Sequence, residues 1–177
     1  MQRNGALRQR QPAVSFAASI SPGSIPAVLL REFFSEDAVK LHLTSTTKDA
    51  VLKELVGLFR LDEKSEAQLY KMLKRRETLG STGIGQGMAI PHCRSTVVTR
   101  LRVAFGRRPE GIDYKAIDDK AVRFFFLIVA PPLEVSNQYL PVLGKLAQFA
   151  KEADVPDRLA NLSAPQDLIK LLDEKKI

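Results

Sequence analysis

One segment, residues 121–132 with the sequence AVRFFFLIVAPP, limits the possible folds of this chain more than any other. It is almost continuously apolar and ends at a pair of prolines. A strand with this pattern lies inside a sheet that is covered on both faces, whereas a strand with one wet face alternates apolar and polar residues. The run is also far shorter than the ~20 residues that a membrane-spanning helix needs. We therefore predict a central strand of an interior sheet.

Other periodic segments supply further strands and the helices that cover the sheet. Residues 38–43 and 101–108 have the pattern of strands, and Val39, Leu41 and Leu43 of the first are expected to share one side. Strands that alternate with helices around a buried sheet place the chain in the α/β class. Helical spacing of apolar residues predicts helices at 48–59, 63–77, 136–153 and 164–176, with at most a short helix at 155–162.

Caps and apolar stripes define these helices further. Met72 is expected in the apolar stripe of the second helix and Leu140 in that of the third. Pro141 must then lie in the first turn of the third helix, where its missing N–H costs nothing. The expected cap residues are, in chain order, Thr46 or Thr47, Asp62 with Ser65 as a weaker alternative, Ser136 or Asn137, and Ser163.

The N-terminal segment is unlike the rest of the chain. Residues 1–31 hold four arginines and no acidic residue, which accounts for +4 of the formal net charge of +7. Residues 1–27 also lack sustained periodicity, so we predict a disordered or non-native extension before a domain at 28–177. A signal or transit peptide is the weaker alternative, because Ser15 and Ser19 interrupt the apolar patch.

Charge and cysteine content narrow the function classes. The charge outside the N-terminal segment is nearly balanced, and no helix-turn-helix, basic-region or aromatic–basic pattern accompanies it, so nucleic acid is not an expected partner. The single cysteine, Cys93, cannot form an intramolecular disulfide and has no ligand pairs for a structural zinc site. We therefore expect a cytoplasmic protein that is not embedded in a membrane and holds no metal.

Four glycines follow the second helix, at positions 80, 83, 85 and 87. Backbone N–H groups of such a loop can converge on an anion, so Gly83, Gly85 and Gly87 are candidate phosphoryl-loop residues. The loop lacks the Gly-Lys-Ser/Thr sequence of a nucleotide P-loop, and Met88 stands where the dinucleotide fingerprint requires its third glycine. A flexible connection between a helix and a strand is the alternative interpretation.

His92 is the strongest candidate for chemistry. Pro91 stiffens the backbone before it, and a neutral imidazole with an ordinary pKa near ~6.5 can act as a nucleophile at physiological pH. Arg75 and Arg76 end the preceding helix and could form an anion clamp beside it. The alternatives are a structural histidine and a solvated helix end. Cys93 is expected to be buried, because neighbouring residues on a strand point to opposite faces.

The complete stretch RRETLGSTGIGQGMAIPHCR, residues 75–94, resembles the active-site signature of the IIA domains of the bacterial phosphotransferase system. The resemblance is to the fructose–mannitol class, most closely its nitrogen-regulatory branch, and extends more weakly from about Val28 to the C-terminus. It implies a mixed β-sheet flanked by helices on both faces. It also implies a phosphoryl relay without a cofactor, in which a phosphohistidine carrier protein phosphorylates the residue that corresponds to His92. The family's supporting arginine corresponds to Arg76.

One position departs from the family's pattern. The family usually carries a second histidine at the start of the helix after the central strand, and Tyr139 occupies that position in NQYLPVLGKLA. A phenol can donate one hydrogen bond to a phosphoryl oxygen, but it cannot carry a positive charge. Tyr139 is therefore the third candidate catalytic residue, after His92 and Arg76.

The resemblance leaves three functions open. The first is a regulatory phosphocarrier of the nitrogen type, a phosphotransferase component that is phosphorylated on His92 and controls partner proteins such as kinases or transporters. The second is the IIA component for uptake of a fructose-like or mannitol-like sugar. The third is a docking module that has lost efficient phosphorylation, for which the presence of Tyr139 is the argument.

Overall fold

The computed structural model describes residues 29–133 and 137–177. At its centre lies β6, Val122–Ala130, in which every residue is buried except the half-buried Arg123. This strand confirms the interior strand that the apolar run predicts. Within the described residues, no helix is both long enough and apolar enough to span a membrane.

The sheet around β6 is mixed. β5 pairs with β6 in antiparallel orientation. β3 and β4 both pair with β6 in parallel, β3 near the start of β6 and β4 near its end. The path through the sheet runs β1-β5-β6-β3-β2, in which β1 is parallel to β5 and β2 is antiparallel to β3. The bounds of these strands are β1 Val39–Lys40, β2 Gly83–Gly85, β3 Met88–Ala89, β4 His92–Arg94 and β5 Arg102–Ile112.

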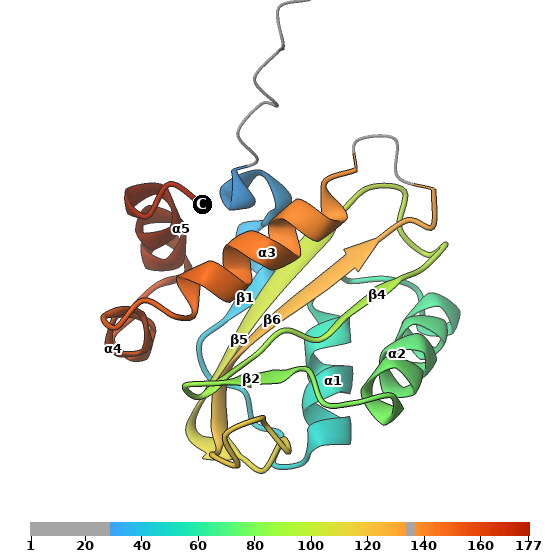
Figure 1. Cartoon of the computed structure of the whole chain (residues 1–177). Helices are drawn as coiled ribbons and strands as arrows, with labels where there is room; N and C mark the ends of the chain where they lie inside the picture. Colours follow the sequence, from blue (N-terminus) through green and yellow to red (C-terminus); the bar gives the residue numbers. More distant parts are fainter. Residues whose placement is uncertain (1–28, 134–136) are drawn as a thin grey trace, which may run out of the picture.

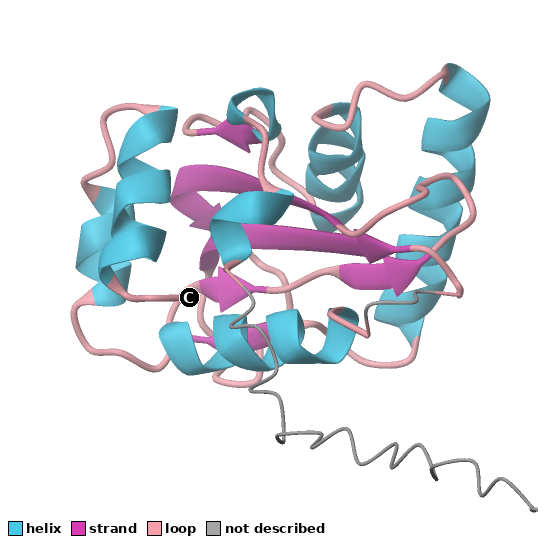
Figure 2. Ribbon diagram, turned by 90° about the horizontal axis from the view of Figure 1, so that it is seen from above, coloured by secondary structure: helices cyan, strands magenta, loops and turns pink. Residues whose placement is uncertain are grey.

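Helices cover both faces of this sheet (Figures 1 and 2). α1 and α2 pack against one face, and α3 crosses the other face with α4 and α5 beside it. The arrangement confirms the α/β class and the mixed sheet flanked by helices. The helix bounds are α1 Lys48–Gly57, α2 Glu63–Thr78, α3 Tyr139–Phe149, α4 Val155–Ala160 and α5 Pro165–Glu174, and two short 3-10 helices, η1 Leu30–Phe33 and η2 Glu36–Ala38, precede β1.

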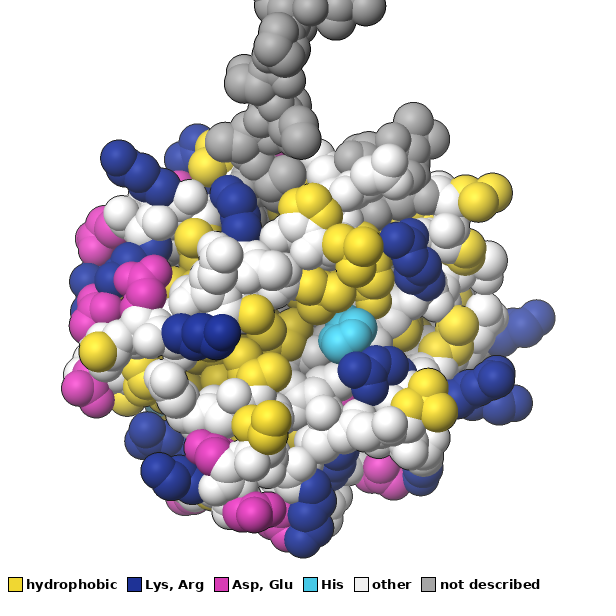
Figure 3. Space-filling model, viewed as in Figure 1, with side chains coloured by type: hydrophobic (Ala, Val, Ile, Leu, Met, Phe, Trp, Pro, Cys, Tyr) yellow, Lys and Arg dark blue, Asp and Glu magenta, His cyan; other side chains and the backbone are white. Residues whose placement is uncertain are grey.

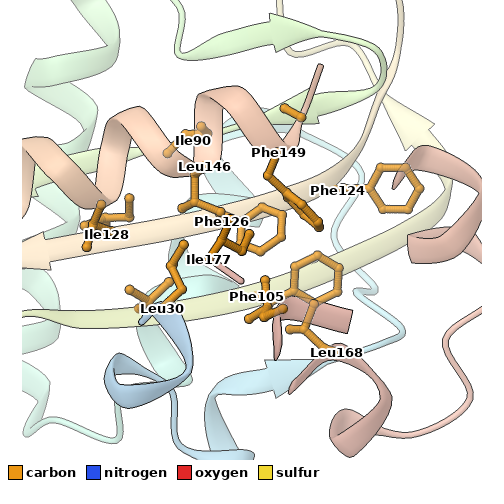
Figure 4. Close-up of a cluster of buried hydrophobic side chains, with 14 of the residues drawn as sticks. Leu30, Ile90, Phe105, Phe124, Phe126, Ile128, Leu146, Phe149, Leu168 and Ile177 are labelled. Atoms are coloured by element: carbon orange, nitrogen blue, oxygen red, sulfur yellow. The ribbon is translucent and has the colours of Figure 1, made fainter. Parts of the chain in front are cut away.

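Successive residues of β6 pack into two separate cores. Phe124 and Phe126 face α3, whereas Phe125 and Leu127 face α1 and α2. Because a strand alternates its side chains between faces, a sheet that is covered twice needs apolar residues at every position of its central strand. Figure 4 shows the core on the α3 side, where the ring of Phe126 packs edge-on against Phe149 with the ring centroids 6.2 Å apart.

Two of the predicted helix caps are confirmed and one is wrong. The side chains of Thr47 and Asp62 cap α1 and α2 by accepting hydrogen bonds from the first-turn N–H groups. At α5 the cap position is Ala164, not Ser163. The carboxylate of Asp167 accepts from the N–H groups of both residues, so a side chain inside the helix performs the capping. At α3 the cap position is Gln138, so Asn137 lies next to the cap and not at it, and Ser136 lies outside the described residues.

For three apolar residues, the predicted face or burial is wrong. Leu43 is buried, but it packs on the α1–α2 side and not with Val39, because the chain leaves the regular strand after Lys40. Met72 is 38% exposed on α2. Leu140 is 70% exposed, because the buried stripe of α3 consists of Tyr139, Val142, Leu146 and Phe149.

Candidate functional site

The glycine-rich stretch forms a hairpin between β2 and β3. Gly85 pairs with Met88, which leaves Gln86 and Gly87 as a two-residue turn. Their φ angles of 55° and 75° are both positive, as the tight turns that match the twist of a β-hairpin require. Gly83 packs so closely that a Cβ there would lie 2.7 Å from the Cα of Ala116. Turn geometry and close packing therefore account for these glycines, and a role as a phosphoryl loop stays a prediction.

The chain from this hairpin continues into β4 and places His92 next to the end of β6. His92 pairs with Ile128, and the N–H of Ile128 donates to the carbonyl oxygen of Pro91 at 2.9 Å. Cys93 points to the other face and is buried, as expected. Its burial raises the pKa of the thiol to about 12, so it is not a nucleophile at neutral pH.

Hydrogen bonds fix the tautomer of His92. Its Nδ1 lies 2.7 Å from the carbonyl oxygen of Ile90. A carbonyl oxygen can only accept, so Nδ1 carries the proton and donates it to this bond. The lone pair is then on Nε2, which accepts a hydrogen bond from Nε of Arg76 at 3.3 Å. The half-buried imidazole thus presents one defined nitrogen to a guanidinium group.

The electrostatic surroundings keep this imidazole neutral. Desolvation by burial lowers the pKa of His92 below its ordinary value, and the positive charge of Arg76 lowers it further. The bond to Ile90 and the negative charge of Glu77 act in the opposite direction without reversing the shift. His92 therefore has an unprotonated Nε2 at pH 7, as a nucleophile requires.

Arg76 and not Arg75 reaches the site. Two hydrogen bonds hold the guanidinium of Arg76. Its Nε donates to Nε2 of His92, and its Nη1 donates to the carbonyl oxygen of Gly80 at 2.9 Å. Arg75 is exposed one position earlier on α2. Figure 3 shows, on the face that α3 crosses, a histidine side chain bordered by basic and hydrophobic side chains.

A buried polar network behind Arg76 was not expected from the sequence. The Glu77 carboxylate is 6% exposed and forms a 2.6 Å ion pair with Nζ of Lys48. It also accepts hydrogen bonds from the hydroxyls of Thr82 and Tyr114. The backbone carbonyl oxygen of Thr82 in turn accepts a hydrogen bond from the N–H of Ile90. The network therefore connects the end of α2 to the segment that carries His92.

Tyr139 and Arg94 lie near His92 on the α3 side of the sheet. Tyr139, the first residue of α3, is 8% exposed, and its ring centroid lies 6.2 Å from that of His92 in an edge-on arrangement. Cζ of Arg94 lies 4.5 Å from the centroid of the Tyr139 ring. The sequence contained a signal for Arg94, because residues two apart on a strand share a face and Arg94 follows His92 by two positions. In the described part of the chain, no group of three or more His, Cys, Asp or Glu side chains could hold a metal ion.

A family model and several known proteins match most of this chain. The model of the family "Phosphoenolpyruvate-dependent sugar phosphotransferase system, EIIA 2" matches residues 32–175. The chain belongs to this family. The fructose-specific EIIA component of Haloferax volcanii is 30% identical to this EIIA type 2 domain over 142 residues, which are 78% of this chain and 90% of that protein. The nitrogen regulatory protein of Pseudomonas aeruginosa is 27% identical over 147 residues, which are 82% of this chain and 95% of the relative.

A solved structure agrees with these relatives. The nitrogen regulatory protein IIA-Ntr from Neisseria meningitidis superposes on this EIIA type 2 domain with a TM-score of 0.75 at 30% sequence identity, covering 82% of this chain and 99% of that one. Other relatives are much longer, since the match covers only 23% of the fructose-specific EIIABC component of Bacillus subtilis. The resemblance to the phosphotransferase IIA domains is thereby confirmed, while nitrogen-regulatory and sugar-specific proteins both match.

Proposed function

We propose that the protein is a phosphocarrier whose His92 accepts a phosphoryl group on Nε2 from a phosphohistidine carrier protein. One observation carries the proposal. Nδ1 of His92 donates its proton to the carbonyl oxygen of Ile90, so the lone pair of the ring is on Nε2 and faces Arg76. The relatives named as phosphotransferase components support this reaction class. Of the candidate residues, His92 is the nucleophile and Arg76 the cation beside it.

The transfer balances without a metal or a nucleotide. Nε2 attacks the phosphorus atom, the N–P bond of the donor breaks, and the donor imidazole takes the bonding electron pair as the new N–P bond forms. The Nδ1 proton stays in its bond to Ile90 throughout. The new N–P bond uses the lone pair that accepts from Nε of Arg76, so this hydrogen bond breaks and the guanidinium donates to the phosphoryl oxygens in its place. The transferred group brings about two negative charges, and the positive charge of Arg76 offsets part of them.

The position of the phosphoryl group tests this assignment. The geometry predicts phosphorylation at Nε2, which nitrogen NMR couplings distinguish from phosphorylation at Nδ1. A phosphoryl group on Nδ1 would contradict the tautomer that we infer, because that nitrogen would have to lose its bond to Ile90. His42 lies exposed near β1 and is the matched control, since His42→Ala should leave phosphorylation unchanged.

We further propose that the phosphoryl group regulates partner proteins, such as kinases or transporters, in the manner of the nitrogen-regulatory branch. The similarity to the nitrogen regulatory proteins along most of their length supports this role. A IIA component for a fructose-like or mannitol-like sugar is the second candidate, which the fructose-specific relative favours.

A chase experiment separates these two roles. The phosphorylated protein is mixed with purified fructose-type and mannitol-type IIB domains, and its phosphoryl occupancy is followed by intact mass. A regulatory phosphocarrier keeps its phosphoryl group, whereas a sugar-uptake component loses it to the matching IIB domain within the time of its own phosphorylation. Rapid loss to either IIB domain would overturn the regulatory proposal in favour of the second candidate.

A further inference from the structure

We propose that Arg94 is a positioning residue for phosphoryl transfer and that it acts through Tyr139. The inference rests on the proposed function of His92 as the phosphoryl acceptor. It concerns the α3 side of the imidazole, where an aromatic ring and a second guanidinium lie in series.

The backbone brings these three side chains together. His92 and Arg94 project from the same face of β4, because they are two residues apart on one strand and pair with Ile128 and Ala130 of β6. This is the face that α3 covers, and Tyr139 is the first residue of α3. The guanidinium of Arg94 covers the ring of Tyr139 at 4.5 Å, and the ring of Tyr139 meets the imidazole at 6.2 Å.

Arg94 is itself anchored. Its Nη1 donates to the carbonyl oxygens of Pro131 and Pro132 at 3.0 and 3.4 Å, just beyond the end of β6. One planar side chain thus connects β4, the segment after β6, and the start of α3. A lysine could keep the charge, but it could not stack on the ring as a planar group while it donates from a fixed fork.

This arrangement complements Arg76. A phosphoryl group on Nε2 would lie near the Arg76 guanidinium, while on the α3 side the ring of Tyr139 packs edge-on against the same imidazole. A cation over a phenol ring attracts its π electrons, which fixes the orientation of the ring and brings positive charge to that side of the site. Arg94 thereby holds the Tyr139 ring against the imidazole in the orientation that the transfer requires.

The test compares Arg94→Gln and Arg94→Lys with Arg102→Gln as the matched control. Arg102 also stacks on an aromatic ring, with its Cζ 4.4 Å from the centroid of Phe59, but it lies on β5 and faces α1. We expect Arg94→Gln to slow phosphorylation of His92 by the carrier protein about threefold to tenfold. Arg94→Lys should recover part of this loss, and Arg102→Gln should react like the wild type.

Two further readouts separate positioning from a purely structural role. The NMR signals of the Tyr139 ring should shift in Arg94→Gln and shift less in Arg94→Lys, because the guanidinium of Arg94 covers this ring. In a double-mutant cycle, Arg94→Gln should add little to the effect of Tyr139→Leu, because both changes remove the same support. The free energy of unfolding, measured for each variant, shows that the proteins compared are folded.

The outcomes are distinct. Slower transfer with shifted Tyr139 ring signals and a non-additive cycle supports the proposal. If Arg94→Gln slowed phosphorylation equally in the wild type and in the Tyr139→Leu variant, the proposal would be overturned, since Arg94 would then act independently of Tyr139. Normal phosphorylation of Arg94→Gln would overturn it as well, while the proposed function of His92 would stand. Failure of the wild-type protein to accept a phosphoryl group would instead refute the proposed function.

Discussion

The contacts that His92 receives from α2 differ in kind from those that it receives from α3. On the α2 side, the contacts are polar and directional: Arg76 donates to Nε2, and the Glu77 carboxylate connects α2 to the strand segment through Thr82. On the α3 side, His92 meets the ring of Tyr139, behind which lies an apolar core around Phe126. The contacts from α2 aim a charge at the reactive nitrogen, and the contacts from α3 pack an aromatic ring against the imidazole.

This difference separates stability from chemistry. Apolar packing stabilises the fold in proportion to the surface that it buries, and it has little direction. Hydrogen bonds to charged groups depend strongly on geometry. We therefore expect substitutions in the apolar core under α3 to act mainly on the free energy of unfolding. Substitutions on the α2 side should act on phosphorylation as well.

The largest effect is expected from Phe126→Ala in the core under α3. Phe126 is fully buried and contacts the rings of Phe34, Phe105 and Phe149. Its truncation should lower the free energy of unfolding by about 3–5 kcal/mol, because it removes transfer energy and leaves a cavity. Urea unfolding measures this loss. The folded fraction should still be phosphorylated at the wild-type rate, and a slowed rate in folded protein would break the proposed separation.

Glu77→Leu on the α2 side should cost about 2–4 kcal/mol of unfolding free energy, because it leaves Lys48, Thr82 and Tyr114 without their shared carboxylate. Unlike Phe126→Ala, it should also slow phosphorylation of the folded protein. The negative charge of Glu77 raises the pKa of His92, so its removal should lower that pKa further, which NMR titration can follow. Glu63→Leu, at the exposed start of α2, is the control. A raised His92 pKa would contradict the account.

Arg76→Ala should slow phosphorylation at least tenfold, since a charge-assisted hydrogen bond contributes about 1.5–3 kcal/mol. The stability should change little, because the side chain is only partly buried. Initial rates with the phosphorylated carrier protein measure the effect. Arg75→Ala removes the same charge one residue earlier and should react normally. Equal slowing by both variants would show that net charge, and not the contact with His92, supports the transfer.

The smallest effect is expected from Tyr139→Phe, which keeps the ring and removes only the hydroxyl. If the hydroxyl donates to the phosphoryl group, the loss of about 0.5–1.5 kcal/mol shifts the phosphorylation equilibrium roughly 2- to 13-fold. Tyr139→His should then do at least as well as the native residue. Phosphoryl occupancy at a fixed carrier concentration compares the three proteins. An unchanged occupancy in Tyr139→Phe would restrict Tyr139 to packing.

The sequence predicted the parts of the fold that local patterns determine. The apolar run of β6 and the caps Thr47 and Asp62 are such patterns, because each depends on neighbours in sequence. The β2–β3 hairpin was missed, since its strands are only two or three residues long and carry no readable alternation. Leu140 was misplaced because the apolar residues of α3 fit more than one helical stripe, and packing against the sheet selects among them.

The candidate site divides in the same way. His92 and Arg76 follow from a continuous motif, and the structure brings the two side chains together. The contact of Glu77 with Tyr114, 37 residues later, and the stacking of Arg94 on Tyr139 join segments that are distant in the sequence, and no local pattern reports such contacts.

Intact mass spectrometry tests the central claim most directly. The protein is incubated with phosphoenolpyruvate, the first enzyme of the phosphotransferase system and its phosphohistidine carrier protein, alongside the His92→Ala variant. The account predicts that the wild type gains one acid-labile phosphoryl group and that His92→Ala gains none. If the mass of the wild type does not rise, or if His92→Ala still gains the group, His92 is not the phosphoryl acceptor and the proposed function is wrong.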